Sequence, residues 1–301
     1  PLLGKGYRVG KGDTIILESC EYCNSFLNFY PTTAVILDVD ADHLDFFKDL
    51  SDVEHSFREF AELVPQGGLV VANGDDANTV ETLRGVDYVS FGFREENRVH
   101  WANASEDFRT FDVICDGKPY CHVSLGVRGR HNAMNALAAA AVAWLYGVEA
   151  APVERALHAF TGAGRRLEYK GRYNGADIYD DYAHHPRELH ALLETVKTMG
   201  YRRVLCAFQP HTYSRTKALF QDFVDELRTV DQAVLADIYA AREQNTVGIS
   251  SQDLAAEVPG AVYCPRLQDV TTYLRGIAQP GDIILTVGAG DIYKAGEALL
   301  K

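Results

Sequence analysis

The feature that most constrains the fold of this chain is the alternation of short apolar runs with amphipathic segments along nearly all of its 301 residues. Six of the apolar runs are rich in Val, Ile and Leu and have the length of buried strands. They comprise residues 14–17, 34–37, 69–72, 203–208, 233–236 and 282–287. Strands that alternate with helices predict an α/β protein with largely parallel sheets.

The segments between these runs carry helix start and stop signals. Ser51 and Glu54 have the spacing of a capping box and precede an apolar helical face. Pro186 can open a helix that Gly200 stops, and the Ala-rich stretch 132–146 predicts a closely packed helix. We therefore expect helices to cover the strands along most of the chain.

Two further patterns indicate how the chain divides into domains. Residues 94–127 are more polar and alternate in hydropathy, which predicts antiparallel hairpins added to the first domain. Glycines at 162 and 164 separate one helical segment from a new series of strands. We expect a first domain over residues 1–164 and a second α/β domain over residues 165–301.

Charge and cysteine content exclude several classes of protein. The 29 Lys and Arg against 42 Asp and Glu give a formal net charge of −13, which argues against nucleic acid or an anionic membrane as a partner. No apolar run reaches the ~20 residues of a membrane-spanning helix. Six cysteines are too sparse for a disulfide scaffold, so we expect thiols in a reducing cytoplasm. Cys20 and Cys23 also have redox or zinc spacing, without a second pair.

Polar clusters follow the predicted strands at their carboxyl ends, where open α/β sheets bind ligands. They comprise Glu18, Asp42-His43, residues 180–186, residues 209–215, Asp237 and Gly288-Ala-Gly290. Six clusters placed in this way predict an active crevice. The sequence does not indicate an oligomeric state.

Each cluster also has a structural interpretation. Glu18, Asp42 and His43 could cap loops or could form a divalent-cation site. Asp180 and Asp181 could cap the following helix or contact a ribose hydroxyl. Of the adjacent His184 and His185, at least one is expected to be structural, because neighbouring side chains diverge. Gly288-Ala-Gly290 favours a tight turn over a dinucleotide fingerprint, since position 293 is Tyr.

Basic residues suggest where phosphate could bind. Arg165 and Arg166 could contact phosphate oxygens or form a surface pair. Residues 130–132 could contact a base or cap the Ala-rich helix. The 301 residues contain no GxxxxGK[ST] loop and so no Walker-type cradle for a triphosphate.

In their order along the chain, these motifs resemble those of the Mur ligases. The strings that carry the resemblance span residues 18–26, 40–45, 129–135, 164–168, 180–186, 208–216, 237–243 and 288–290. The resemblance implies part of a central ATP-binding domain followed by a Rossmann-like C-terminal α/β domain. The strings Asp-Asp-Tyr-Ala-His-His-Pro and Phe-Gln-Pro-His resemble the member that adds L-alanine to UDP-N-acetylmuramate in peptidoglycan synthesis.

The resemblance implies an ATP- and Mg²⁺-dependent amide-bond ligase acting on small-molecule substrates in the cytoplasm. ATP would phosphorylate the carboxylate of the UDP-linked sugar, and the amine of L-alanine would displace phosphate from the acyl phosphate. Cations around the reacting centre would stabilise the charge that develops there.

The resemblance also implies roles for individual residues. In the first domain, Glu18 and His43 would hold Mg²⁺, with Glu21 as a weaker metal or supporting residue. The nucleotide side of this domain would comprise His131, Asn132 and Asn135.

In the second domain, Arg166 would contact phosphate, with Arg165 as a second candidate for the same contact. Asp180, Asp181 and Tyr182 would approach the ATP ribose or the reacting centre. The amino-acid pocket would comprise His184, His211, Tyr213 and Arg215, with Arg215 pairing with the alanine carboxylate. Thr212 departs from the Arg of relatives and weakens the pocket assignment. We expect the catalytic group to comprise Glu18, His43, Arg166, His211 and Arg215.

The chain departs from the family at its front. The family has a UDP-binding domain and a Gly-Lys-Thr phosphate loop ahead of the segment that begins here, so we expect a piece of a longer ligase that is inactive alone. Three alternatives stay open: a ligase that recycles muropeptides, a folate-polyglutamate-type ligase, and a non-catalytic module that binds nucleotide or a partner.

Overall fold

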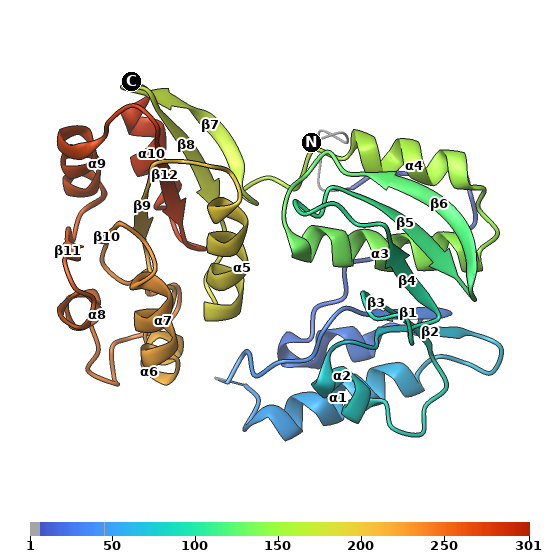
Figure 1. The fold of residues 1–301 in the computed structure, drawn as a ribbon. Coiled ribbons are helices and arrows are strands. Elements are labelled where there is room, and N and C mark those ends of the chain that lie inside the picture. Colours follow the sequence, from blue (N-terminus) through green and yellow to red (C-terminus); the bar gives the residue numbers. More distant parts are fainter. Residues whose placement is uncertain (1–6, 45) are drawn as a thin grey trace. The chain divides into compact units, whose positions relative to one another are not determined.

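The computed structural model describes residues 7–44 and 46–301, and the chain divides into two compact units (Figure 1). The first unit ends at Thr161 and the second begins at Gly162. Asp45, the last residue of the 40–45 motif, lies outside the described residues. Each unit contains one six-stranded sheet.

The sheet of the first unit follows chain order from β1 to β6. Its strands are β1 (Thr33–Ile36), β2 (Leu69–Asn73), β3 (Val89–Gly92), β4 (Val99–Ala102), β5 (Thr110–Cys115) and β6 (Lys118–Ser124). Strands β1 to β4 are parallel, and β5 and β6 pair antiparallel. The hairpin pattern predicted over residues 94–127 is confirmed, and these strands extend the parallel sheet.

The helices of the first unit are η1 (Tyr22–Asn28), α1 (Leu50–Glu62), α2 (Ala77–Thr82), α3 (Arg130–Leu145) and α4 (Ala150–Ala159). The Ala-rich α3 packs small side chains into the core that β3, β5 and β6 share. The predicted capping box at Ser51 is wrong. The N-cap of helix α1 is Asp49, two residues earlier, and its carboxylate accepts a 3.0 Å hydrogen bond from the Asp52 amide.

The strand predicted over residues 14–17 is also wrong. This stretch forms no strand, and the exposed fractions of Ile15, Ile16 and Leu17 are 81%, 92% and 57%. Apolar β-branched composition favours a strand only where a neighbouring strand supplies hydrogen bonds and a face to pack on. Among the described strands, β1 pairs only with β2, and residues 14–17 do not join that edge.

The sheet of the second unit has the order β11-β10-β9-β12-β8-β7 and is parallel except for β7. Its strands are β7 (Glu168–Tyr173), β8 (Ala176–Asp181), β9 (Arg203–Phe208), β10 (Gln232–Leu235), β11 (Val262–Tyr263) and β12 (Asp282–Val287). The predicted strands 203–208 and 282–287 are confirmed to the residue. All six residues of β12 are buried, as expected for the centre of a parallel sheet.

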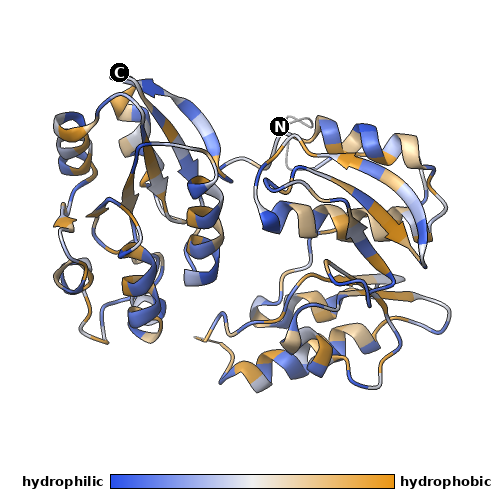
Figure 2. Ribbon diagram, viewed as in Figure 1, coloured by the Kyte–Doolittle hydropathy of each residue, from blue (hydrophilic) through white to orange (hydrophobic). Residues whose placement is uncertain are grey.

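Helices cover the two faces of this sheet and form two separate cores. They are α5 (Pro186–Lys197), α6 (Tyr213–Ala218), α7 (Phe220–Leu227), α8 (Ser251–Glu257), α9 (Leu267–Ile277) and α10 (Tyr293–Leu299). Helices α5 and α7 carry both hydrophilic and hydrophobic residues (Figure 2) and bury their apolar side against the sheet. The predicted start of α5 at Pro186 is confirmed, and the helix ends at Lys197, three residues before Gly200.

Four cysteines, at positions 115, 121, 206 and 264, are buried, whereas Cys20 and Cys23 are exposed. All six are free thiols. Within the described part of the chain, no helix is long and apolar enough to span a bilayer.

Candidate functional site

Three of the predicted polar clusters meet in the second unit because their strands are neighbours. In the β9-β12-β8 order, Val287 pairs with Asp181 on one side and Phe208 on the other. The segments that follow these three residues therefore leave the same edge of the sheet. This edge is the carboxyl end of the parallel strands, where α/β sheets place their ligands.

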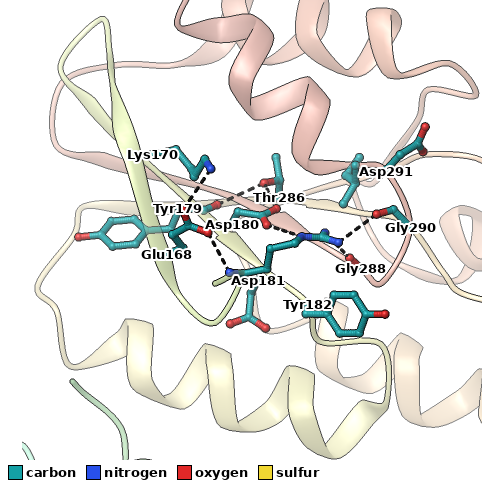
Figure 3. A network of polar contacts seen from close by, with 12 residues as sticks. Glu168, Lys170, Tyr179, Asp180, Asp181, Tyr182, Thr286, Gly288, Gly290 and Asp291 are labelled. Atoms are coloured by element: carbon teal, nitrogen blue, oxygen red, sulfur yellow. Dashed lines mark hydrogen bonds and ion pairs between the residues drawn. The ribbon is translucent and has the colours of Figure 1, made fainter. Parts of the chain in front are cut away.

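Arg165 joins two of these clusters, and Figure 3 labels its partners Asp180, Gly288 and Gly290. Its Nε donates to the Asp180 carboxylate at 2.7 Å, and its terminal nitrogens donate to the carbonyls of Gly288 at 2.7 Å and Gly290 at 3.1 Å. Asp180 is only 1% exposed and also accepts a hydrogen bond from the Thr286 hydroxyl at 2.7 Å. In this structure the Asp180 carboxylate is thus engaged inside the domain.

Asp181 is also held internally. Its carboxylate accepts hydrogen bonds from the backbone amides of Leu167 at 2.7 Å and Ala183 at 2.8 Å. Burial raises the pKa of Asp181 to about 6 and outweighs these two hydrogen bonds. Tyr182, which follows, is 37% exposed. Of Asp180, Asp181 and Tyr182, only Tyr182 has a side chain that is open to a ligand.

Arg166 differs from its neighbour Arg165 because half of its side chain is exposed. It pairs with the Glu188 carboxylate at 3.0 Å, and Glu188 also accepts a hydrogen bond from the His184 amide at 2.9 Å. Burial acts to raise the pKa of Glu188, but the charges of His184 and Arg166 and the amide hydrogen bond lower it overall. Glu188 therefore holds Arg166 and His184 together as an ionised carboxylate.

Glu188 was not among the predicted site residues. It forms a capping box with His185, whose Nδ1 accepts a hydrogen bond from the Arg187 amide at 3.2 Å at the start of α5. The sequence contains the Glu of a capping box three residues after the N-cap, but His is an unusual residue at the N-cap itself. His185 is thus structural, as expected for one of the two adjacent histidines, while His184 faces His211.

The predicted amino-acid pocket surrounds His211. The His211 ring stacks on Tyr239 with centroids 5.8 Å apart and meets the His184 ring at 5.6 Å. Arg215, four residues further along the chain on α6, contacts the Nδ1 of His211 at 3.3 Å. The structure therefore brings His184, His211 and Arg215 together.

Two further residues support this pocket and were missed. The Glu243 carboxylate accepts hydrogen bonds from the amides of Tyr213 at 2.6 Å and Ser214 at 2.9 Å, and from the Ser214 hydroxyl. The Gln209 side-chain oxygen accepts hydrogen bonds from the amides of Asp291 at 2.8 Å and Ile292 at 3.1 Å. Both lie within motifs, but only the three-dimensional contacts show that they fix loops.

In the first unit, the predicted cation residues lie on irregular segments. The His43 Nε2 is 3.2 Å from the Glu21 carboxylate and 4.0 Å from the Asp42 carboxylate, whereas Glu18 is exposed. The hydrogen bond from His43 lowers the pKa of Glu21. Over residues 7–44 and 46–301, no group of three His, Cys, Asp or Glu side chains is arranged to hold a metal. The structure thus brings Glu21, the supporting candidate, to His43.

The predicted nucleotide-side residues of the first unit lie on the first turns of α3. The Asn132 side chain donates to the Arg128 carbonyl at 2.7 Å and so supports the start of the helix. His131 and Asn135 are exposed. Arg130 lies over the Phe93 ring at 4.3 Å. His131 and Asn135 are therefore accessible to a ligand at this helix end.

Comparison with known proteins adds to this geometry. The family model of the Mur ligase middle domain matches residues 9–143, and that of the Mur ligase glutamate ligase domain matches residues 165–290. A UDP-N-acetylmuramate–L-alanine ligase from Caldanaerobacter subterraneus is 42% identical over 308 residues, which cover 99% of this chain and 67% of the relative.

Two solved structures share the fold of this chain. A UDP-N-acetylmuramate-alanine ligase from Thermotoga maritima has a TM-score of 0.73 at 25% identity, over 92% of this chain and 60% of that one. A MurF ligase from the same organism in complex with ADP has a TM-score of 0.67 at 16% identity, over 90% and 61% of the two chains. The chain spans about two thirds of the length of the curated relatives it matches. It belongs to the Mur ligase family.

Proposed function

We propose that this chain supplies the middle and C-terminal domains of an ATP-dependent ligase that joins L-alanine to UDP-N-acetylmuramate in cytoplasmic peptidoglycan synthesis. The observation that carries the proposal is the meeting of the 180–186, 209–215 and 288–290 clusters at one sheet edge. The 42% identity to an L-alanine ligase over nearly the whole chain supports this choice of substrates.

The chemistry requires two displacements. A carboxylate oxygen of the sugar attacks the terminal phosphorus of ATP, and ADP leaves. The amine of L-alanine then attacks the acyl carbon, forms a tetrahedral intermediate, loses a proton and expels phosphate. Guanidinium groups lower the barrier where they meet the charge that builds on phosphate and carboxylate oxygens.

In the second domain, Arg166 would make the phosphate contact. Its side chain is half exposed, and its ion-pair partner among the described residues is Glu188. Tyr182 offers its exposed ring to the nucleotide. Arg215 would pair with the alanine carboxylate. His211 lies beside Arg215, and the His184 ring contacts the His211 ring. Tyr213 stays a predicted pocket residue at the start of α6.

In the first domain, His131, Asn132 and Asn135 would face the nucleotide from the start of α3. Glu18 and His43 stay the proposed Mg²⁺ ligands, and the carboxylates of Glu21 and Asp42 beside His43 would add oxygen ligands. Because no three such side chains of the described residues are arranged to hold a metal in this structure, the segment would have to rearrange to bind the ion. The ion would neutralise phosphate charge when bound. Asp180 would act through the Arg165 side chain that it holds, and Asp181 through the backbone amides that it holds, since both carboxylates are buried.

The test is ADP release by the full natural protein with UDP-N-acetylmuramate, ATP, Mg²⁺ and one acceptor at a time. L-Alanine should support turnover, and L-glutamate should not. Preferential turnover with an L-alanyl peptide would replace the proposal with the muropeptide-recycling ligase. Nucleotide binding without ADP release for any acceptor would favour the non-catalytic module.

We further propose that the 301 residues by themselves do not turn over, because they contain no GxxxxGK[ST] loop to hold a triphosphate. The same assay on this segment alone should give no ADP above the rate without enzyme. ADP release that depends on L-alanine would contradict this.

A further inference from the structure

We propose that Arg165 is a positioning residue that locks Tyr182 to the loop 288–290, and that Arg166 alone of the pair is available to a phosphate. The kinetic part of this inference rests on the proposed function. The structural part rests on the contacts of the Arg165 side chain, which lie entirely within the second unit.

The Arg165 guanidinium is already committed. Each of its three nitrogens donates a hydrogen bond, to Asp180, Gly290 and Gly288 respectively. Its charged partner is a carboxylate that is 1% exposed. A phosphate could recruit this guanidinium only by leaving the buried Asp180 charge unpaired, which is costly.

Two aromatic rings enclose the same guanidinium. Its central carbon lies 5.0 Å from the centroid of the Tyr182 ring and 4.8 Å from that of Tyr293. The backbone of Arg165 adds a further connection, because its carbonyl accepts a 2.7 Å hydrogen bond from the Tyr182 amide. Both the main chain and the ring of Tyr182 are thus in contact with Arg165.

The backbone of Arg165 is itself constrained. Its φ is +58°, a left-handed conformation that is uncommon for a residue with a Cβ. Its amide donates to the Glu168 carboxylate at 2.8 Å, and Glu168 pairs with Lys170 at 3.2 Å. Strained conformations of this kind persist where the surrounding contacts determine them.

The loop that Arg165 holds reaches the other half of the site. A Cβ at Gly290 would lie 2.3 Å from the Gln209 side-chain oxygen and 2.7 Å from the Tyr239 ring. Tyr239 in turn stacks on His211. Displacement of the 288–290 loop would therefore be felt at Tyr239 and His211 as well as at Tyr182.

The experiment compares Arg165→Met and Arg165→Lys with wild type in the full natural protein. Methionine fills similar volume but removes the charge and all three hydrogen bonds. Lysine keeps the charge but cannot span three acceptors and two rings. We expect Arg165→Met to raise the KM for ATP by roughly three- to thirtyfold, with a smaller change in kcat, and Arg165→Lys to recover only part of the loss.

Arg203→Met is the matched control. Arg203 also pairs with a fully buried carboxylate, that of Asp282, at 2.7 Å and donates to the Ile277 carbonyl at 2.9 Å. It begins β9, at the opposite end of the strands from Tyr182. This variant should lower the unfolding midpoint as Arg165→Met does, but leave the KM for ATP unchanged.

A double-mutant cycle separates positioning from general loss of stability. If Arg165 acts through Tyr182, the effects of Arg165→Met and Tyr182→Ala on the KM for ATP should be strongly non-additive. The cycle of Arg203→Met with Tyr182→Ala should be additive. Additivity in both cycles would overturn the proposal.

Hydrogen exchange provides a readout that does not depend on activity. Arg165→Met should speed exchange of the amides of Tyr182 and Gly288, while Arg203→Met leaves them slow. If wild type shows no ligase activity but this exchange pattern appears, the proposed function fails and the positioning role stands. If wild type is active and the Arg165 variants change neither exchange nor KM, the positioning role fails.

Discussion

The two regions that carry predicted site residues are built in opposite ways. The Arg165 network in the second unit joins the ends of β8 and β12 around the Asp180 carboxylate, which is 1% exposed. The His43 cluster in the first unit joins irregular segments, and the carboxylate of its partner Glu21 is 29% exposed. The Arg165 network of the second unit is therefore held in place by the sheet before any ligand binds.

The difference teaches where each region obtains its order. Burial strengthens the charged hydrogen bonds of Arg165 and makes each partner costly to lose. Water reaches the partly exposed contacts of His43 and screens them, so they contribute less to stability. We infer that the second-unit site is preorganised and that the first-unit cluster acquires its final geometry only with its ligands.

The largest expected loss of stability comes from a substitution that breaks the buried Arg165 network. Asp180→Ala leaves Arg165 without its carboxylate partner and should lower the free energy of unfolding of the second unit by about 3–5 kcal/mol. Urea unfolding followed by circular dichroism measures this loss. Trp101 and Trp144, the two tryptophans of the chain, both pack in the first unit, so their fluorescence should change much less. A loss under ~1 kcal/mol would remove the contrast between the regions.

The next largest effect is a contribution of Asp181 to the pH dependence of stability. Its pKa of about 6 in the folded protein lies above that of an unfolded aspartate, so the folded state binds more protons between these values. Stability should therefore fall as pH rises from about 4 to about 6, by up to about 3 kcal/mol, and change little above that range. Asp181→Asn should abolish this component. A wild-type minus Asp181→Asn difference that stays flat over this range would contradict the assignment.

A smaller effect is expected where a carboxylate supports a helix start. Glu243→Ala removes three hydrogen bonds to Tyr213 and Ser214 and should destabilise the second unit by about 1–2 kcal/mol. It should also raise the KM for L-alanine, because Arg215 lies two residues further along α6. Glu243→Gln keeps one acceptor oxygen and should lose less in both measurements. Equal losses in the two variants would assign the effect to the charge.

The smallest expected effect on stability concerns the His43 cluster of the first unit. Glu21→Gln weakens the contact with His43 and should change the free energy of unfolding by less than ~1 kcal/mol. Because the pKa of Glu21 is lowered, its contribution is present at neutral pH and is lost as pH falls through that pKa. Thermal unfolding with and without Mg²⁺ checks the comparison. A large loss without Mg²⁺ would show that this cluster, too, is preorganised.

The sequence predicted the parts of the fold that depend on burial. Strands β9 and β12 were located to the residue, because continuous Val, Ile and Leu runs bounded by polar residues leave few other interpretations. Residues 14–17 have the same composition, but the prediction failed, since composition cannot supply the neighbouring strand that pairing requires.

The site was predictable in its location but less so in its contacts. Strand-end position was enough to bring His211 and Arg215 into one neighbourhood. It could not distinguish Arg165 from Arg166, which are adjacent in the sequence, because the left-handed backbone at Arg165 sends the two side chains to different partners. Glu188, Gln209 and Glu243 were missed because each acts on the backbone of a distant or neighbouring loop.

The distribution of thiols offers a way to observe the first-unit cluster directly. Burial raises the pKa of Cys115 and Cys206 to about 12 and keeps these thiols out of solvent. Cys20 and Cys23 are exposed and flank Glu21 in the sequence. A maleimide dye should therefore label the segment around Glu21 through its natural cysteines, without any engineered cysteine. Its emission would report, in real time, whether Mg²⁺ orders that segment.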